Sequence, residues 1–226
     1  MNLLLLTGGN HPYHQSTPVL KKFIEEAGHT VTLREDSKAL TDGTLVNQDA
    51  IIFNTLRTED ATLTRIEQNS LIEFIKKGKG FIPIHISGSI PEKWPEYATI
   101  TGGGWVSGVS FHPPYGTFQV DITDSNHPCS EGLQSFQTND ELYMGIDYGN
   151  DIDVFITSSF EGGNFETNRV GMEKRYMPKG TFPLAWTKNY GRGRVFVTLL
   201  GHDGKSHSSH QFQRMILNGI DWITGG

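Results

Sequence analysis

The chain has 226 residues, 36% of them hydrophobic, and a formal net charge of −6 from 19 basic and 25 acidic side chains. This length predicts one domain with a sizeable core, and the scattered Lys and Arg residues lack the basic footprint of a nucleic-acid-binding protein. The single cysteine, Cys129, excludes an intrachain disulfide framework and zinc or redox motifs of the CxxC type.

The sequence gives no sign of a membrane segment. No apolar stretch approaches the roughly 18 residues that a membrane-spanning helix needs, and the leucine run at residues 3–6 is too short for a signal peptide. We therefore expect a cytoplasmic protein with neither a membrane nor a nucleic acid as partner. A single domain over residues 1–226 is expected, and self-association into a homo-oligomer stays open.

Strands and helices alternate in the first third of the chain. Apolar residues recur at helical spacing in residues 17–26 and 66–75. Short strand-like runs lie at residues 3–7, 29–33, 49–54 and 80–85. Such a βαβαβ succession predicts an α/β fold with a doubly wound, mostly parallel sheet in flavodoxin-like order.

The middle of the chain has a different character. Residues 87–116 are rich in Gly, Pro and aromatic residues, which predicts an irregular, glycine-rich lobe over the carboxyl ends of the strands, where binding residues gather. The polar, glycine-rich residues 161–180 are expected to form a mobile loop or a hairpin tip. Further strands are expected at residues 116–122, 153–158, 182–186 and 194–200, and a closing helix at residues 208–223.

Three of the predicted strands run directly into histidines. The first strand leads to His11 and His14, residues 80–84 lead to His85, and residues 194–200 lead to His202. Ligands of an open parallel sheet bind at the carboxyl ends of its strands, and imidazoles there can bind a metal or move protons near neutral pH. His14 is preferred over His11 because it lies closer to the predicted helix start.

His85 occupies the turn after a central strand. Some α/β hydrolases and amidotransferases carry a Ser or Cys nucleophile at that turn. Here the residue is a histidine, and Ser87 lacks the flanking Gly-x-Ser-x-Gly pattern. Nucleophilic acyl transfer is therefore disfavoured, and a glutamine amidotransferase is not expected. The structural alternative is a buried His85 that is hydrogen-bonded to backbone.

Asp140 and Glu141 are adjacent carboxylates in a segment that reads as extended. Neighbouring side chains of an extended chain point to opposite faces, so only one of the two can face a given site. We choose Glu141 for the site and Asp140 as its turn-forming or substrate-contacting partner. A solvated acidic pair is the alternative.

The candidate side chains His14, His85, His112, Glu141 and His202 fall on five segments that this topology can bring to one edge. Histidine and carboxylate sets bind Zn, Mn, Fe or Co without thiolate, and a catalytic metal site keeps an open coordination position. A divalent metal is therefore a candidate cofactor. An exposed loop histidine is the alternative for His112.

The order of several motifs resembles the trehalose-utilisation, or ThuA-like, family. The matching segments cover nearly the whole chain and are Gly8-Gly9 to His14, residues 78–85, Gly102-Gly103-Gly104 followed by His112-Pro113, residues 140–143, and residues 190–203. The resemblance implies a fold like that of class I glutamine amidotransferases without their cysteine nucleophile. It also implies a role in the metabolism of trehalose-type disaccharides and 3-keto-glycosides, with a divalent metal in some members.

Two hypotheses follow. In the first, a metal-assisted enzyme carries out elimination, hydrolysis or isomerisation of a 3-keto-glycoside or trehalose-type derivative, with the metal polarising the ketone and His85 or Glu141 acting as acid or base. His14, His112 and His202 are then metal-ligand or sugar-contact candidates, and Trp105, Tyr143 and Trp186 are candidates for stacking on the small-molecule sugar. In the second, the chain is a non-catalytic carbohydrate-binding or regulatory protein. An amidase that uses Ser87 is a weaker third reading.

Overall fold

The fold was obtained as a computed structural model that describes residues 1–166 and 174–225. One half of the main sheet is parallel, with its strands in the order β2-β1-β3-β4-β11, and we call it the parallel half. This is the flavodoxin-like order, so the predicted fold class is confirmed. The elements are β1 (Asn2–Gly8), α1 (Tyr13–Glu26), β2 (Thr30–Arg34), β3 (Ala50–Thr55), α2 (Arg65–Lys76), β4 (Gly80–Pro83) and β11 (Gly193–Thr198).

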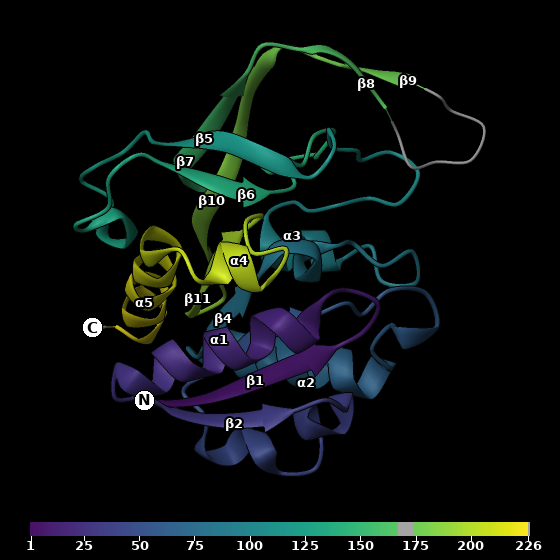
Figure 1. Cartoon of the computed structure of the whole chain (residues 1–226). Coiled ribbons are helices and arrows are strands. Elements are labelled where there is room, and N and C mark those ends of the chain that lie inside the picture. The colour runs from purple at the N-terminus through teal and green to yellow at the C-terminus, as the bar shows by residue number, and fades with distance from the viewer. Residues whose placement is uncertain (167–173, 226) are drawn as a thin grey trace.

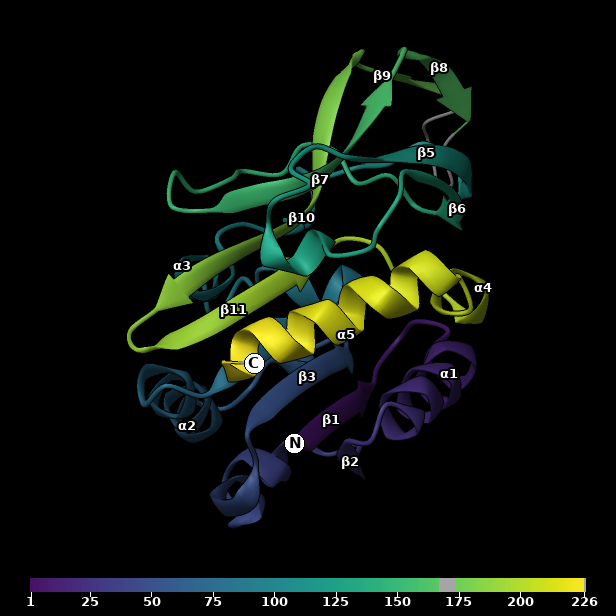
Figure 2. The same ribbon diagram turned by 90° about the vertical axis from the view of Figure 1, so that its left-hand side faces the viewer.

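The two faces of this sheet are covered by different helices (Figures 1 and 2). Leu3 and Leu5 of β1 pack with α1 and with α5 (His210–Thr224), whereas Leu4 and Leu6 pack with α2 and α3 (Tyr97–Thr101). Alternate side chains of a strand point to opposite faces, so an uninterrupted apolar strand is stable only when both faces are buried. The leucine run of β1 meets this condition.

An antiparallel extension continues the same sheet beyond β11. It runs in the order β10-β7-β5-β6, and a hairpin joins β10 to β11. Its strands are β5 (Gly116–Ile122), β6 (Phe136–Asp140), β7 (Asp153–Phe160) and β10 (Gly180–Tyr190). β6 was not expected as a strand. It lies at the far edge of the sheet, and its end delivers the Asp140–Glu141 pair.

The expected loop or hairpin tip at residues 161–180 is described only in part. Its two ends pair antiparallel as β8 (Gly163–Glu166) and β9 (Lys174–Met177), while residues 167–173 lie outside the described residues. The pair projects from the end of the antiparallel extension (Figure 1).

The glycine-rich lobe between β4 and β5 lies over the carboxyl ends of the parallel strands, as predicted (Figure 1). It contains the 3-10 turn η4 (His85–Gly88) and α3, and is otherwise irregular. Gly104 brings the lobe against η4, since a Cβ at this position would lie 1.8 Å from the carbonyl oxygen of Gly88. Only a glycine allows so close an approach.

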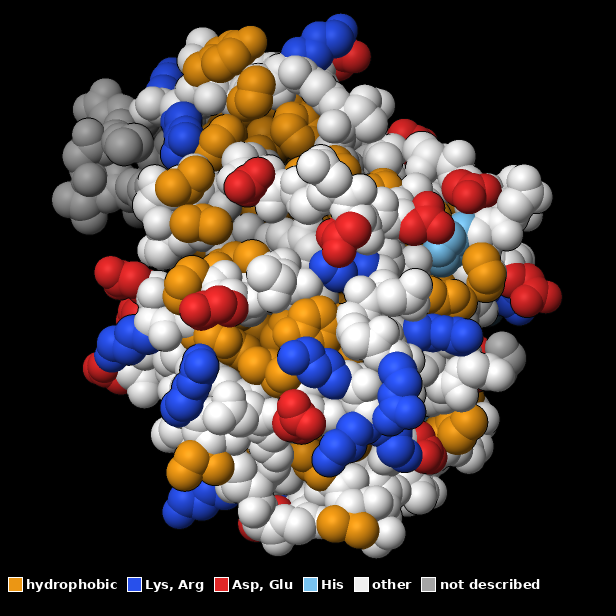
Figure 3. Space-filling view, turned by 180° about the vertical axis from the view of Figure 1, so that it is seen from behind, with side chains coloured by type: hydrophobic (Ala, Val, Ile, Leu, Met, Phe, Trp, Pro, Cys, Tyr) orange, Lys and Arg blue, Asp and Glu red, His pale blue; other side chains and the backbone are white. Residues whose placement is uncertain are grey.

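The surface of the side opposite to the view of Figure 1 is mixed. Figure 3 shows Lys and Arg side chains there among acidic and apolar ones. Across residues 1–166 and 174–225, no helix has both the length and the apolar character that a membrane crossing requires.

Candidate functional site

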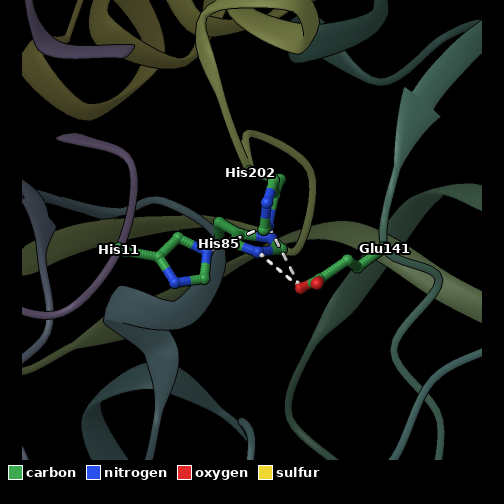
Figure 4. A group of neighbouring side chains, drawn as sticks. All are labelled: His11, His85, Glu141 and His202. Carbon is green, nitrogen blue, oxygen red and sulfur yellow. Dashed lines mark hydrogen bonds and ion pairs between the residues drawn. The ribbon is translucent and has the colours of Figure 1, made fainter. Parts of the chain in front are cut away.

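Three histidines and one glutamate converge at the carboxyl edge of the parallel strands (Figure 4). His11 comes from the loop after β1, His85 follows β4, His202 follows β11, and Glu141 follows β6. One potential ligand atom from each of the four lies within 4.8 Å of the others. We call these four residues the His/Glu group.

His85 lies at a strained elbow after β4. Its φ of 53° falls in the left-handed region, which non-glycine residues adopt rarely and mostly where the surrounding structure enforces it. Its Nδ1 lies 2.7 Å from the carbonyl oxygen of Leu199 and must donate to it, because a carbonyl only accepts. Its Nε2 therefore accepts in the neutral ring, and the Tyr143 hydroxyl lies 2.7 Å from it. The ring is fixed in one tautomer, as in many metal-binding histidines.

Glu141 joins the histidines. Its Oε2 lies 3.2 Å from Nδ1 of His202 and 3.3 Å from Nε2 of His85. His11 completes the group, with its Nε2 3.0 Å from the same Nδ1 of His202. Because β6 belongs to the antiparallel extension and the histidines to the parallel half, the site forms only where the two halves meet.

Asp140 is buried beside the His/Glu group and binds the backbone of the segments that carry Glu141 and His202. Its carboxylate accepts the backbone N–H groups of Gly201 at 2.7 Å, Glu141 at 2.9 Å and His202 at 3.3 Å. Gly201 has a φ of +116°, and a Cβ there would lie 2.7 Å from Ile84, so this tight approach requires glycine. Asp140 thus positions Glu141 and His202. The predicted turn-forming role fits these contacts, whereas its burial leaves no exposed carboxylate for a substrate.

Electrostatics in the group favour an ionised Glu141 and a neutral His11, whereas they favour the protonated form of His202. Burial alone would raise the pKa of Glu141, but the neighbouring His202 and His85 outweigh burial and hold that pKa well below its usual range. Burial, with the nearby His85 and His202, lowers the pKa of His11 to about 3. The pKa of His202 is raised, because the hydrogen bond and charge of Glu141 outweigh its burial. Neutral His11 and ionised Glu141 are the forms that ligate metals.

Aromatic rings form one wall of the site. The centroid of the Trp105 ring lies 4.6 Å from the centroid of the Tyr143 ring and 5.7 Å from that of the His112 ring. The Nε2 of His112 lies 3.7 Å from Oε1 of Glu141, and its Nδ1 donates to the Pro113 carbonyl at 2.7 Å. The His112 side chain is 29% exposed, so it borders the His/Glu group and is open to solvent.

The structure brings together His85, Glu141 and His202, with His112, Trp105 and Tyr143 beside them. It does not bring His14 to them. This side chain is exposed on α1 and lies near Gln15. His11 occupies the place expected for His14, because α1 begins at Tyr13 and not near residue 17. The sequence signal for His11 was present, since it also follows the first strand.

Trp186 also lies away from the group. Its side chain is fully buried, its indole N–H donates to the Thr101 carbonyl at 2.7 Å, and it packs in the core with Tyr148. It therefore contributes to the core of the α2–α3 side and offers no surface for stacking on a ligand.

The donor set of the His/Glu group fits a divalent metal ion. It offers imidazole nitrogens and one ionised carboxylate, which suit Zn, Mn, Fe or Co. His85 has the backbone carbonyl partner typical of a metal-bound imidazole. Compared with the expected ligands, His202 is retained, His11 replaces His14, and His85 and Glu141 take the place of His112.

Comparisons with known proteins agree with this architecture. The family model for trehalose utilisation, ThuA, matches residues 2–223. A ThuA-like protein from Parabacteroides merdae is 24% identical, with a TM-score of 0.76, over 99% of this chain and 89% of its own. A ThuA-like protein from Bacteroides uniformis is 18% identical, with a TM-score of 0.75, over 98% of this chain and 90% of its own.

The fold extends to more distant proteins. A glutamine amidotransferase from Thermotoga maritima is 7% identical, with a TM-score of 0.56, over 100% of this chain and 99% of its own. This likeness concerns the fold alone. A search of curated proteins found no match.

Proposed function

The chain belongs to the trehalose-utilisation (ThuA) family, and on this premise we propose that it is an enzyme of sugar metabolism that acts on 3-keto-glycosides or trehalose-type derivatives at the His/Glu group. The observation that carries the proposal is the convergence of His11, His85, Glu141 and His202 to within 4.8 Å from four separate segments. Clusters of buried and partly buried titratable side chains with shifted pKa values are typical of functional sites.

A divalent ion is part of the proposal. His11, His85, Glu141 and His202 would hold it, and it would supply a Lewis acid that polarises a substrate carbonyl oxygen. Three of the four residues are already held in place, His85 through its ring by Leu199 and Glu141 and His202 through their backbone N–H groups by Asp140. Preorganised ligands lose little freedom when they bind.

Proton transfer is assigned to His112. His85 is committed to the ion, because Leu199 fixes its Nδ1–H and the ligand atom would be its Nε2, which faces the Tyr143 hydroxyl. His112 is partly exposed, and its Nδ1–H is fixed by Pro113. A ketone at C3 of a glycoside acidifies the C2 proton. His112 Nε2 would take that proton as the C1–O bond breaks and the C1=C2 bond forms, and the protonated ring would then return a proton to the leaving oxygen.

The wall beside His112 suits a sugar ring. Trp105 is partly exposed and borders both His112 and Tyr143. Aromatic faces pack well against the C–H faces of a ring, while nearby polar groups fix its orientation. Trp105 is therefore the stacking candidate that the geometry supports, and Tyr143 serves to hold His85.

The test is turnover of 3-keto-glycosides by the metal-supplemented protein, followed by the release of the C1 substituent. His85→Ala should lower kcat/KM by about 100-fold or more, because it would remove a ligand of the ion. His14→Ala is the matched control, because it removes a histidine from the neighbouring turn that lies outside the group. Equal losses in both variants would contradict the assignment.

The same experiment separates the enzyme from a non-catalytic carbohydrate-binding or regulatory protein. If calorimetry detects sugar binding but none of the keto-glycosides is converted under any metal condition, the binding function stands and the enzymatic one fails. In that case His85→Ala should weaken binding only modestly.

A further inference from the structure

The Tyr143 hydroxyl lies among the ligand atoms of the His/Glu group, although Tyr143 is not one of its four members. Its oxygen is 2.7 Å from Nε2 of His85 and 3.3 Å from Oε2 of Glu141. Within the group, that Oε2 is 3.3 Å from Nε2 of His85 and 3.2 Å from Nδ1 of His202. The hydroxyl therefore lies as close to the ligand atoms as they lie to one another.

The contact of Tyr143 with His85 differs from that of a supporting hydrogen-bond partner. Such a partner fixes a metal-binding imidazole through the nitrogen that does not bind the ion. The Leu199 carbonyl already does this, because it accepts Nδ1–H at 2.7 Å. Tyr143 instead contacts Nε2, through which His85 would bind the ion. This nitrogen has one lone pair in the neutral ring, so it cannot bind an ion and also accept the hydroxyl.

Burial limits what the hydroxyl can do once an ion binds. Tyr143 is only 1% exposed, so its oxygen cannot turn to bulk water. Its ring packs against those of Trp105 and His85, with centroid distances of 4.6 Å and 4.5 Å. The oxygen is therefore held beside the ion, and its lone pairs can bind the ion directly. A ligand that carries an acidic proton releases it to solvent when it binds a metal.

We propose that Tyr143 is a fifth ligand of the ion, through its phenolate oxygen. This assignment rests on the ion-binding part of the proposed function and not on its substrate. It also specifies the class of metal. Five protein ligands, two of them anionic oxygens, exceed the four of a tetrahedral zinc site and favour iron or manganese, and tyrosine serves as a protein ligand of iron in haem enzymes.

Ferric iron added to the full chain tests this ligand, because a phenolate bound to ferric iron gives a visible charge-transfer band. We expect the band in wild type and in Tyr115→Phe, and its loss in Tyr143→Phe. Tyr115 is the matched control, since its ring centroid is 5.1 Å from that of His202 but its hydroxyl donates to Asp203. A band that survives Tyr143→Phe, or iron that binds to wild type without the band, would overturn the assignment.

Calorimetric titration with manganese gives a second readout. Removal of a ligand oxygen should lower the manganese affinity of Tyr143→Phe by about 10–100-fold. An increased affinity would show that the hydroxyl only competes with the ion for Nε2 of His85, and this result or an unchanged affinity would overturn the proposal.

Iron-loaded crystals of the wild-type chain need no variant and decide the question even if Tyr143→Phe does not fold. We expect anomalous scattering at the iron edge within bonding distance of the Tyr143 oxygen. An ion in the His/Glu group that lies outside this distance would overturn the fifth ligand and leave the ion site standing. If wild type binds neither iron nor manganese, the ion site of the proposed function fails as well.

Discussion

The two halves of the sheet contribute to the site in different ways. The parallel half supplies His11, His85 and His202, each directly after a strand, so their convergence follows from the regular arrangement of strand ends. The antiparallel extension supplies Asp140 and Glu141 from its most distant strand, β6. The histidines are therefore placed by topology, while the carboxylates are placed by specific hydrogen bonds across the junction.

This comparison predicts the largest loss of metal affinity and turnover for Glu141, the side chain of the antiparallel extension that contacts the histidines of the parallel half. Glu141→Gln keeps the size of the side chain but removes the charge beside His85 and His202. Metal affinity and turnover should each fall by about 100-fold or more, because a ligand charge is lost. Isothermal titration with zinc and a kinetic assay measure the two effects. Glu131→Gln, an exposed change outside the group, should alter neither.

A smaller loss of metal affinity is expected for Asp140, whose carboxylate accepts backbone N–H groups of the parallel half. Asp140→Asn replaces one acceptor oxygen by an amide that cannot accept the N–H of Gly201 or His202. Metal affinity should fall by about 10–100-fold, and the free energy of unfolding by about 1–3 kcal/mol. Denaturant unfolding and zinc titration test this. A loss of stability with unchanged metal affinity would show that Asp140 does not position the ligands.

One buried histidine outside the His/Glu group, His207, is expected to make the stability of the fold depend on pH. His207 is fully buried, donates from Nδ1 to the Asp203 carbonyl at 2.9 Å, and has its pKa lowered to about 4 by burial. Between pH 6.5 and 4 the unfolded chain binds a proton that the folded chain does not. Stability present above pH 6.5 is thus lost as the pH falls, by about 1.4 kcal/mol per pH unit for this proton.

Metal-free wild type and His207→Gln, compared by urea unfolding from pH 7 to 4, test this assignment. The slope should be shallower in the variant over this window. Identical slopes would mean that His207 is not held neutral in the folded protein.

The smallest effect concerns the lobe. The Tyr115 hydroxyl donates to Asp203 at 2.8 Å, and its ring lies 5.1 Å from that of His202. Tyr115→Phe keeps the ring and removes one partly exposed hydrogen bond, which is worth about 0.5–1.5 kcal/mol. We expect KM to rise a few-fold with kcat nearly unchanged, measured by steady-state kinetics. A larger fall in kcat would place Tyr115 in the reaction itself.

Much of the parallel half could be predicted from the sequence because its signals are local. The residues that produce each signal, such as the apolar run of β1 or the helical spacing of α2, lie close together in the sequence. The ends of parallel strands also share one edge of the sheet. The structure accordingly places His85 and His202 side by side in the His/Glu group, as their positions after strands predicted.

The rest depended on information that is not local. Pro18 makes a helix start near residue 17 a natural reading, yet α1 begins at Tyr13 and places His11, not His14, in the loop. Trp186 and Trp105 have the same stacking chemistry, and only their tertiary surroundings separate a core residue from a wall of the site. The pairing of β5 with β6, which delivers Glu141, likewise joins segments through a long-range register.

The most direct test of the His/Glu group is the metal content of protein purified without chelators or a nickel column, measured by inductively coupled plasma mass spectrometry for wild type, His11→Ala and His14→Ala. The geometry predicts about one divalent ion per chain in wild type and in His14→Ala, and a strongly reduced content in His11→Ala. Metal-free wild type that also fails to take up zinc, manganese, iron or cobalt would contradict a metal site built from His11, His85, Glu141 and His202.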